Sequence, residues 1–153
     1  MARRVAVREG LFTDGDAPSL LGSRCAACGA HHFPRHDTCP YCAEEGPVPT
    51  QLSGAGSLWS WTAVTAAPPG YRGPVPYGVG VVELPEGIRI ITRLTVSDPA
   101  GLALGQAMEL RVVPLHTDAD GNEVVTYSFA PVDEPGPVDK PSPVDKPSPV
   151  EAP

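Results

Sequence analysis

Four cysteines, grouped as two Cys-x-x-Cys pairs, are the residues of this sequence best suited to chemistry. Cys25 and Cys28 form the first pair, and Cys39 and Cys42 form the second pair after a spacer of ten residues. Paired thiolates on two short turns can meet around one tetrahedral zinc ion. Four thiolate ligands leave no coordination position open, so the predicted Zn²⁺ is structural. Gly29, directly after the first pair, permits the backbone conformation that such a turn needs.

Two redox interpretations of the cysteines remain as alternatives. The segment Cys39-Pro40-Tyr41-Cys42 is identical to the glutaredoxin redox tetrapeptide, which lies at the start of a helix. Here the Ala-Glu-Glu-Gly-Pro that follows leaves room for barely one helical turn. An electron carrier with a rubredoxin-type iron centre is the other interpretation, although the spacer is short for one. The second pair upstream makes a metal site the better explanation.

Recognisable catalytic motifs are absent from the sequence. It has no nucleophile elbow, no His-Glu-x-x-His, no phosphate-binding loop and no Gly-rich dinucleotide fingerprint. His31, His32 and His36 lie in the spacer, and we expect them to be solvated because the cysteines already complete a ligand set. The sequence therefore predicts a protein that is not an enzyme on its own.

Composition limits the classes of protein to which the chain can belong. Its 153 residues carry a formal net charge of −7, which disfavours nucleic-acid or anionic-membrane binding because both require a positive surface. The 20 prolines and 16 glycines disfavour a helical bundle. No run of 18 apolar residues is present, and no apolar leader follows the first residues. We therefore expect a cytoplasmic protein with reduced cysteines and with no membrane or nucleic-acid partner.

The pattern of apolar residues predicts a mainly β protein. Beyond residue 50, short runs with strand-like alternation are separated by glycine and proline turns. Five strands are predicted, at residues 57–64, 77–84, 88–96, 108–115 and 123–129. Five short strands in so few residues fit a small antiparallel barrel such as the OB-fold.

Four stretches are predicted along the chain. They are a lead-in at residues 1–20, a zinc ribbon at 21–50, an OB-fold domain at 51–133 and a proline-rich tail at 134–153. The lead-in favours neither a strand nor a helix. The tail repeats the sequence of residues 137–143 at residues 143–149 and has no aromatic residue, so we expect it to be disordered. Its repeats suit a spacer or a ligand for a proline-binding module.

Aromatic residues of the predicted barrel allow a different function. Trp59 and Trp61 are two residues apart and are expected to share one face of the first strand. Aromatic side chains on an OB-fold can stack on bases, so a free-standing binder of single-stranded nucleic acid is an alternative. We favour a core or interface role, because residues 1–133 contain 9 Arg against 14 acidic residues.

The residues around the cysteines resemble the DUF35 family. Residues 23–29, Phe33-Pro34-Arg35 and Cys39-Pro40-Tyr41-Cys42 are similar to its rubredoxin-like zinc ribbon. Residues 54–64, residues 76–84 and the Leu104-Gly105 turn are similar to its acyl-CoA-associated OB-fold domain. The resemblance covers about residues 20–132. The lead-in departs from the helical segment with which many relatives begin.

This resemblance implies a non-catalytic partner of an acyl-CoA enzyme. Family members generally pair with thiolases and thiolase-like lyases, so the chain would form a hetero-oligomer with a thiolase-fold enzyme. It would complete or cover the acyl-CoA channel, while the partner does the chemistry. Candidate contacts to the partner or its CoA thioester are Arg24, Phe33, Arg35, Trp59, Trp61 and Tyr77. Arg72, Arg89 and Arg93 are further candidates for the CoA phosphates, which suit a guanidinium fork.

Overall fold

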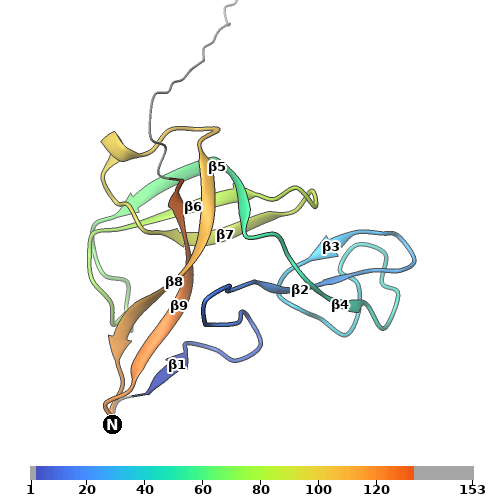
Figure 1. The fold of residues 1–153 in the computed structure, drawn as a ribbon, viewed down its shortest axis with the longest axis horizontal. Coiled ribbons are helices and arrows are strands. Elements are labelled where there is room, and N and C mark those ends of the chain that lie inside the picture. Colours follow the sequence, from blue (N-terminus) through green and yellow to red (C-terminus); the bar gives the residue numbers. More distant parts are fainter. Residues whose placement is uncertain (1–2, 133–153) are drawn as a thin grey trace, which may run out of the picture.

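The computed structural model describes residues 3–132 of the chain. Within them lie a barrel and a separate three-stranded sheet beside it (Figure 1). The strands are β1 (Arg4–Ala6), β2 (Leu21–Arg24), β3 (His31–His32), β4 (Val48–Gln51), β5 (Ala55–Val64), β6 (Tyr77–Glu83), β7 (Arg89–Leu94), β8 (Ala107–Thr117) and β9 (Glu123–Pro131), and a 3-10 helix, η1 (Pro99–Gly101), precedes β8. None of the described helical segments is long and apolar enough to cross a membrane. The predicted tail, residues 134–153, lies outside the described residues.

Strands β5 to β9 form a closed barrel. Their order is β9–β7–β6–β5–β8, and the pairing of β8 with β9 closes the ring. The contact between β7 and β9 is short and parallel, and it includes the pair Arg93–Ser128. The other four contacts around the barrel are antiparallel. The five-stranded barrel predicted from the sequence is therefore confirmed.

Alternate positions along the strands face the inside of the barrel. In β6, Gly78, Gly80 and Val82 are buried, whereas the residues between them are half-buried. This period of two is what places one face of a strand against the core. Phe129 of β9, which is 0% exposed, belongs to the same core. A side chain at Gly78 is excluded, because its Cβ would collide with the carbonyl oxygen of Val96.

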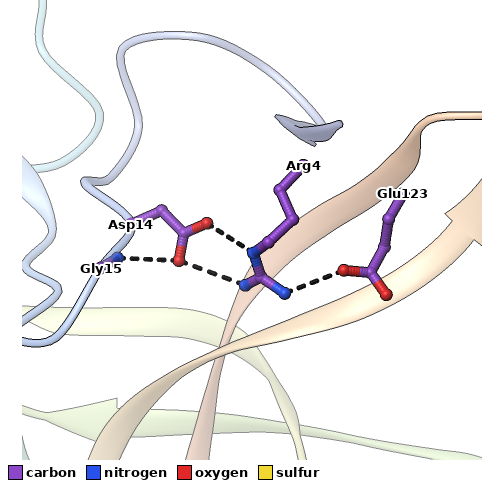
Figure 2. Close-up of polar contacts among 4 residues, drawn as sticks. All are labelled: Arg4, Asp14, Gly15 and Glu123. Atoms are coloured by element: carbon purple, nitrogen blue, oxygen red, sulfur yellow. Dashed lines mark hydrogen bonds and ion pairs between the residues drawn. The ribbon is translucent and has the colours of Figure 1, made fainter. Parts of the chain in front are cut away.

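The lead-in forms strand β1, which the sequence did not indicate. β1 pairs in parallel with the start of β9. The Arg4 guanidinium donates to both carboxylate oxygens of Asp14, at 2.9 and 3.2 Å, and to Glu123 at 2.9 Å (Figure 2). The hydrogen bonds from Arg4 lower the pKa of Asp14, and Asp14 in turn raises the pKa of Arg4. This contact ties the loop after β1 to the barrel.

A second sheet, of β3, β2 and β4, carries the cysteine-containing turns beside the barrel (Figure 1). We call residues 21–51 the ribbon. Its strands are antiparallel, with β2 in the middle. Within this range, Phe33 is the residue that packs against the apolar core of the barrel, and it is partly buried. The linker to β5 is held by the N–H of Ser53, which donates to the Glu86 carboxylate at 2.7 Å. The ribbon thus sits against the barrel through few contacts.

Candidate metal centre and contact surfaces

The four cysteine thiols converge on one point of the ribbon. Their Sγ atoms all lie within 4.8 Å of one another. Between the two turns, the Sγ of Cys25 is 3.6 Å from that of Cys42, and the Sγ of Cys28 is 3.7 Å from that of Cys39. A tetrahedral ion with metal–sulfur bonds of about 2.3 Å would hold its sulfur atoms about 3.8 Å apart. The four thiols therefore fit one tetrahedral metal ion.

Cys25 and Cys28 lie on a tight turn that follows β2. The N–H of Gly29 donates to the carbonyl oxygen of Cys25 at 2.8 Å, and the N–H of Cys25 donates to Ala30 at 2.9 Å. The N–H of Cys28 is directed at the Sγ of Cys25, 3.5 Å away. Gly29 has a φ of +79°, in the left-handed region that glycine enters without the clash of a Cβ.

The turn from Cys39 to Cys42 repeats this backbone pattern. The N–H of Ala43 donates to the carbonyl oxygen of Cys39 at 3.0 Å, and the N–H of Cys39 donates to Glu44 at 2.8 Å. Ala43 takes the position of Gly29 and has a φ of +68°. A residue with a Cβ is less stable there by about 1–2 kcal/mol. The second turn therefore carries backbone strain, which the sequence did not reveal because alanine is not a turn signal.

Two of the thiols, Cys25 and Cys42, have shifted pKa values. The N–H of Cys28 is the main group that lowers the pKa of Cys25, to about 7. The N–H of Glu44 acts in the same direction on Cys42, but the adjacent thiols, Cys25 first, together with desolvation raise the pKa of Cys42 to about 12. All four groups become thiolates together when a cation balances their mutual repulsion. A metal ion bound here would therefore lower the pKa of Cys42 below this value.

Arg24 and His32 flank the first turn. A Cβ on Gly29 would lie 3.7 Å from a guanidinium nitrogen of Arg24, so this cation can offset thiolate charge. His32 is 3% exposed, and the expectation that it is solvated is wrong. It pairs with the buried Ser23 of β2, and its Nδ1 lies 3.3 Å from the carbonyl oxygen of Pro34. The pairing of β3 with β2 therefore buries His32.

The two tryptophans of β5 lie on different faces of the barrel wall. A bulge interrupts the β5 register between Leu58 and Ser60, and its extra residue shifts the alternation by one. Trp59, at the bulge, is 50% exposed, and the Arg89 guanidinium lies 4.1 Å from its ring centroid. Trp61 packs against the core. The shared face expected from their spacing is wrong, because a single inserted residue reverses the face.

Tyr77 belongs to a surface cluster that we call the Arg93 face, made of exposed Ile91 and half-buried Arg93, Tyr71 and Tyr77. The Tyr71 and Tyr77 rings lie 4.9 Å apart, and the Arg93 guanidinium is 4.4 Å from the Tyr77 centroid. Arg93 also donates to the Tyr71 hydroxyl oxygen at 2.9 Å. None of the ion pairs among the described residues involves Arg93. Ile91, two positions earlier on β7, is 71% exposed.

Phe33 and Arg35 contact other parts of the same chain. The Phe33 ring meets Tyr127 of β9 edge-on, with 5.5 Å between centroids. The Nε of Arg35 donates to the carbonyl oxygen of Gly22 at 2.8 Å. Both side chains therefore stabilise the ribbon or its seat on the barrel. A contact of either residue with a partner stays a prediction.

The chain joins a rubredoxin-like cysteine ribbon to a closed OB-fold barrel, so it is a two-part protein of the ribbon and OB-fold class. Residues 12–48 match the family described as the rubredoxin-like zinc ribbon domain of ChsH2. Residues 49–113 match the family described as the C-terminal OB-fold domain of ChsH2. The chain belongs to this ChsH2-type DUF35 family, and the resemblance noted in the sequence is confirmed.

Relatives of known name align with most of the chain. A DUF35 domain-containing scaffold protein of Methanocaldococcus jannaschii is 31% identical over 72% of this chain and 78% of its own length. The benzoylsuccinyl-CoA thiolase subunit BbsA of Thauera aromatica is 34% identical over 76% of this chain and 78% of its own length. A solved structure described as an Ltp2–ChsH2 (DUF35) aldolase has a TM-score of 0.60 and 27% identity, over 75% of this chain and 86% of that chain.

Proposed function

We propose that the chain is a non-catalytic accessory subunit that docks on a thiolase-like enzyme and helps to form or cover its acyl-CoA site. The observation that carries the proposal is what the relatives are named as. One is named a thiolase subunit, one is named a scaffold protein, and one belongs to a structure described as an aldolase of Ltp2 and ChsH2. The chemistry of the reaction would then belong to the enzyme partner.

The donor set of the ribbon supports a structural metal in this subunit. Cys25, Cys28, Cys39 and Cys42 would hold Zn²⁺, which when bound supplies a cross-link between the two turns. Four thiolates saturate a tetrahedral ion, which leaves no position for a substrate. We also propose a cytoplasmic location, because reducing conditions keep the thiols available to the metal.

The Arg93 face supports the docking part of the proposal. Tyrosine and arginine side chains, which this face presents half-buried at the surface, are enriched in the energetic centres of interfaces. The Arg93 guanidinium is held in place by the two tyrosines. A guanidinium placed in this way can pair with a carboxylate of the enzyme or with the phosphates of its CoA thioester.

Purification of the untagged chain from its own cells tests this function, with mass-spectrometric identification of bound proteins and metal analysis of the same sample. We expect a thiolase-family protein in near-equal amount, and zinc in the ribbon. Ile91→Asp should abolish co-purification, because it places a charge in the apolar part of the face. Leu104→Asp is the matched control, since Leu104 is 68% exposed and lies outside the face. Recovery of the zinc-loaded chain without any acyl-CoA enzyme would contradict the proposal.

A further inference from the structure

Trp59 and Arg89 form an exposed platform next to the Arg93 face, because Arg89 and Ile91 lie on the same outward side of β7. Arg89 stacks on Trp59 and donates from Nε to the Glu83 carboxylate at 3.1 Å. The Arg89 and Glu83 side chains are 49% and 42% exposed, so both charges remain accessible to a ligand. A hollow of about 450 Å³ lies alongside, and it is lined by Gly56, Ser57, Glu83, Leu84, Pro85 and Gly87.

The described chain ends four strand spacings from this platform around the barrel wall. The N–H of Val132 donates to the carbonyl oxygen of Ala107 at 2.9 Å. From Ala107, one row of paired residues crosses the barrel wall through Ser57 and Glu83 to Arg89. Neighbouring strands are about 4.8 Å apart, so the path from Val132 to Arg89 along the surface is about 19 Å.

Beyond Val132, the sequence places an acidic residue at a matching distance. Residues 137–143 and 143–149 both have the sequence Pro-Val-Asp-Lys-Pro-Ser-Pro. An extended polyproline-type segment advances about 3.1 Å per residue, so one that begins at Val132 would reach Asp139 after about 22 Å. The first repeat is therefore long enough to place its aspartate at Arg89.

The repeat also matches the platform in charge and in shape. Asp139 and Lys140 are neighbours with charges opposite to those of Arg89 and Glu83. Proline-rich segments bind aromatic-lined grooves, in which proline rings pack on exposed aromatic side chains such as Trp59. The repeat places a proline two residues before its aspartate and another two residues after it, so a proline ring can lie beside the Arg89–Trp59 stack, whose guanidinium and ring are 4.1 Å apart.

We propose that the Trp59–Arg89 platform and its hollow bind the proline-rich repeat of the same chain. Asp139 pairs with Arg89, and a flanking proline packs on Trp59. The second repeat can make the same contact through Asp145, so the tail has two alternative positions on the platform.

Nuclear magnetic resonance of the full-length, metal-loaded chain tests the proposal through the indole N–H signals of Trp59 and Trp61, assigned with Trp59→Phe. We expect the combined Asp139→Asn and Asp145→Asn substitutions to shift the Trp59 signal and leave the Trp61 signal in place. Replacement of residues 137–149 by Gly and Ser at constant length should produce the same shift or a larger one. High salt should move the wild-type signal in the same direction, because part of the contact is ionic.

A matched control separates docking from a change in net charge. Asp16→Asn combined with Asp120→Asn removes the same charge from exposed positions of the body and should leave the Trp59 signal unchanged. Arg89→Glu should release the tail, and its combination with Asp139→Lys and Asp145→Lys should restore the docked signal. A Trp59 signal identical with and without the repeats would overturn the proposal. A shift that depends on protein concentration would also overturn it, since the contact would then join two copies of the chain.

Discussion

The barrel and the ribbon are built from the same kind of strand, but they are held together by different means. The barrel encloses an apolar cluster that includes Leu58, Met108 and Phe129, each at most 1% exposed. Residues 21–51 contribute partly buried Phe33 to that cluster and bury Cys25 and Cys39 in their own centre. Apolar burial therefore stabilises the barrel, whereas we expect the ribbon to depend on the metal proposed for its cysteines.

The barrel and the ribbon should therefore lose their structure under different conditions. A mutation in the apolar core acts on the barrel and on everything that packs against it. Loss of the proposed metal should act on the ribbon, because the buried side chains of its two turns are those of Cys25 and Cys39. Substitutions can separate the dependence of the barrel on apolar burial from the dependence of the ribbon on the proposed metal.

The largest expected effect is the loss of a metal ligand. Cys39→Ser should release the metal and unfold the ribbon, because binding and folding of small zinc domains are one process worth about 10–16 kcal/mol. Hydrogen exchange should show lost protection in residues 21–51 and retained protection in β5 to β9. Thr38→Ser is the neighbouring control, with metal content and exchange unchanged. A fully protected ribbon in Cys39→Ser would show that the metal does not stabilise it.

Truncation of a core side chain should instead destabilise the barrel. Phe129→Ala leaves a cavity at a position that is 0% exposed, and we expect a loss of about 3–5 kcal/mol in the free energy of unfolding. Urea denaturation of the metal-loaded protein measures the loss. Ile91→Ala, at an exposed position of β7, should change the same quantity by less than about 0.5 kcal/mol. Equal losses in the two variants would contradict the assignment of the core.

The two cysteine turns offer a finer comparison within the ribbon. Gly29→Ala should weaken metal binding by about 1 kcal/mol, because it places a Cβ at a φ of +79°. Ala43→Gly should act in the reverse direction, by at most about 1 kcal/mol, because it relieves the same strain in the second turn. Competition with a chelator at constant pH measures both. Changes of the same sign would refute the equivalence of the turns.

The smallest expected effect is the response of the lead-in to acid. The pKa of Asp14 is lowered in the folded protein, so its contact with Arg4 contributes stability above the unfolded pKa of about 3.9. That contribution is lost as the pH falls through the folded pKa. The pair is exposed, so the contribution is less than about 1 kcal/mol. Asp14→Asn should remove the pH dependence of lead-in hydrogen exchange in this range. Its persistence in the variant would assign the dependence to another group.

Local patterns predicted much of this structure. The Cys-x-x-Cys spacing indicated a site where the thiols do converge, and residues 77–84 were predicted as the strand that forms β6 (Tyr77–Glu83). In both cases the signal lies within a few neighbouring residues. The turn chemistry and alternation of such segments can be read without knowledge of the rest of the chain.

Features that depend on distant partners were not predicted. β1 exists because its backbone pairs with β9, more than 100 residues away, and the sequence of Arg4–Ala6 carries no strand signal of its own. The exposure of Trp59 depends on a bulge defined by the register with β6. The burial of His32 depends on its pairing with β2. Each of these is a property of two strands together.

The triple pairing of β9 has a consequence for the order in which the protein is made. β9 contacts β1, β7 and β8, so the barrel cannot close until residues 123–131 have left the ribosome. Until then, the edges of β1, β7 and β8 that will pair with β9 carry unpaired backbone N–H and C=O groups. The cysteines lie within residues 25–42 and emerge much earlier. The ribbon can therefore bind the proposed metal and fold first. The barrel then assembles next to the folded ribbon.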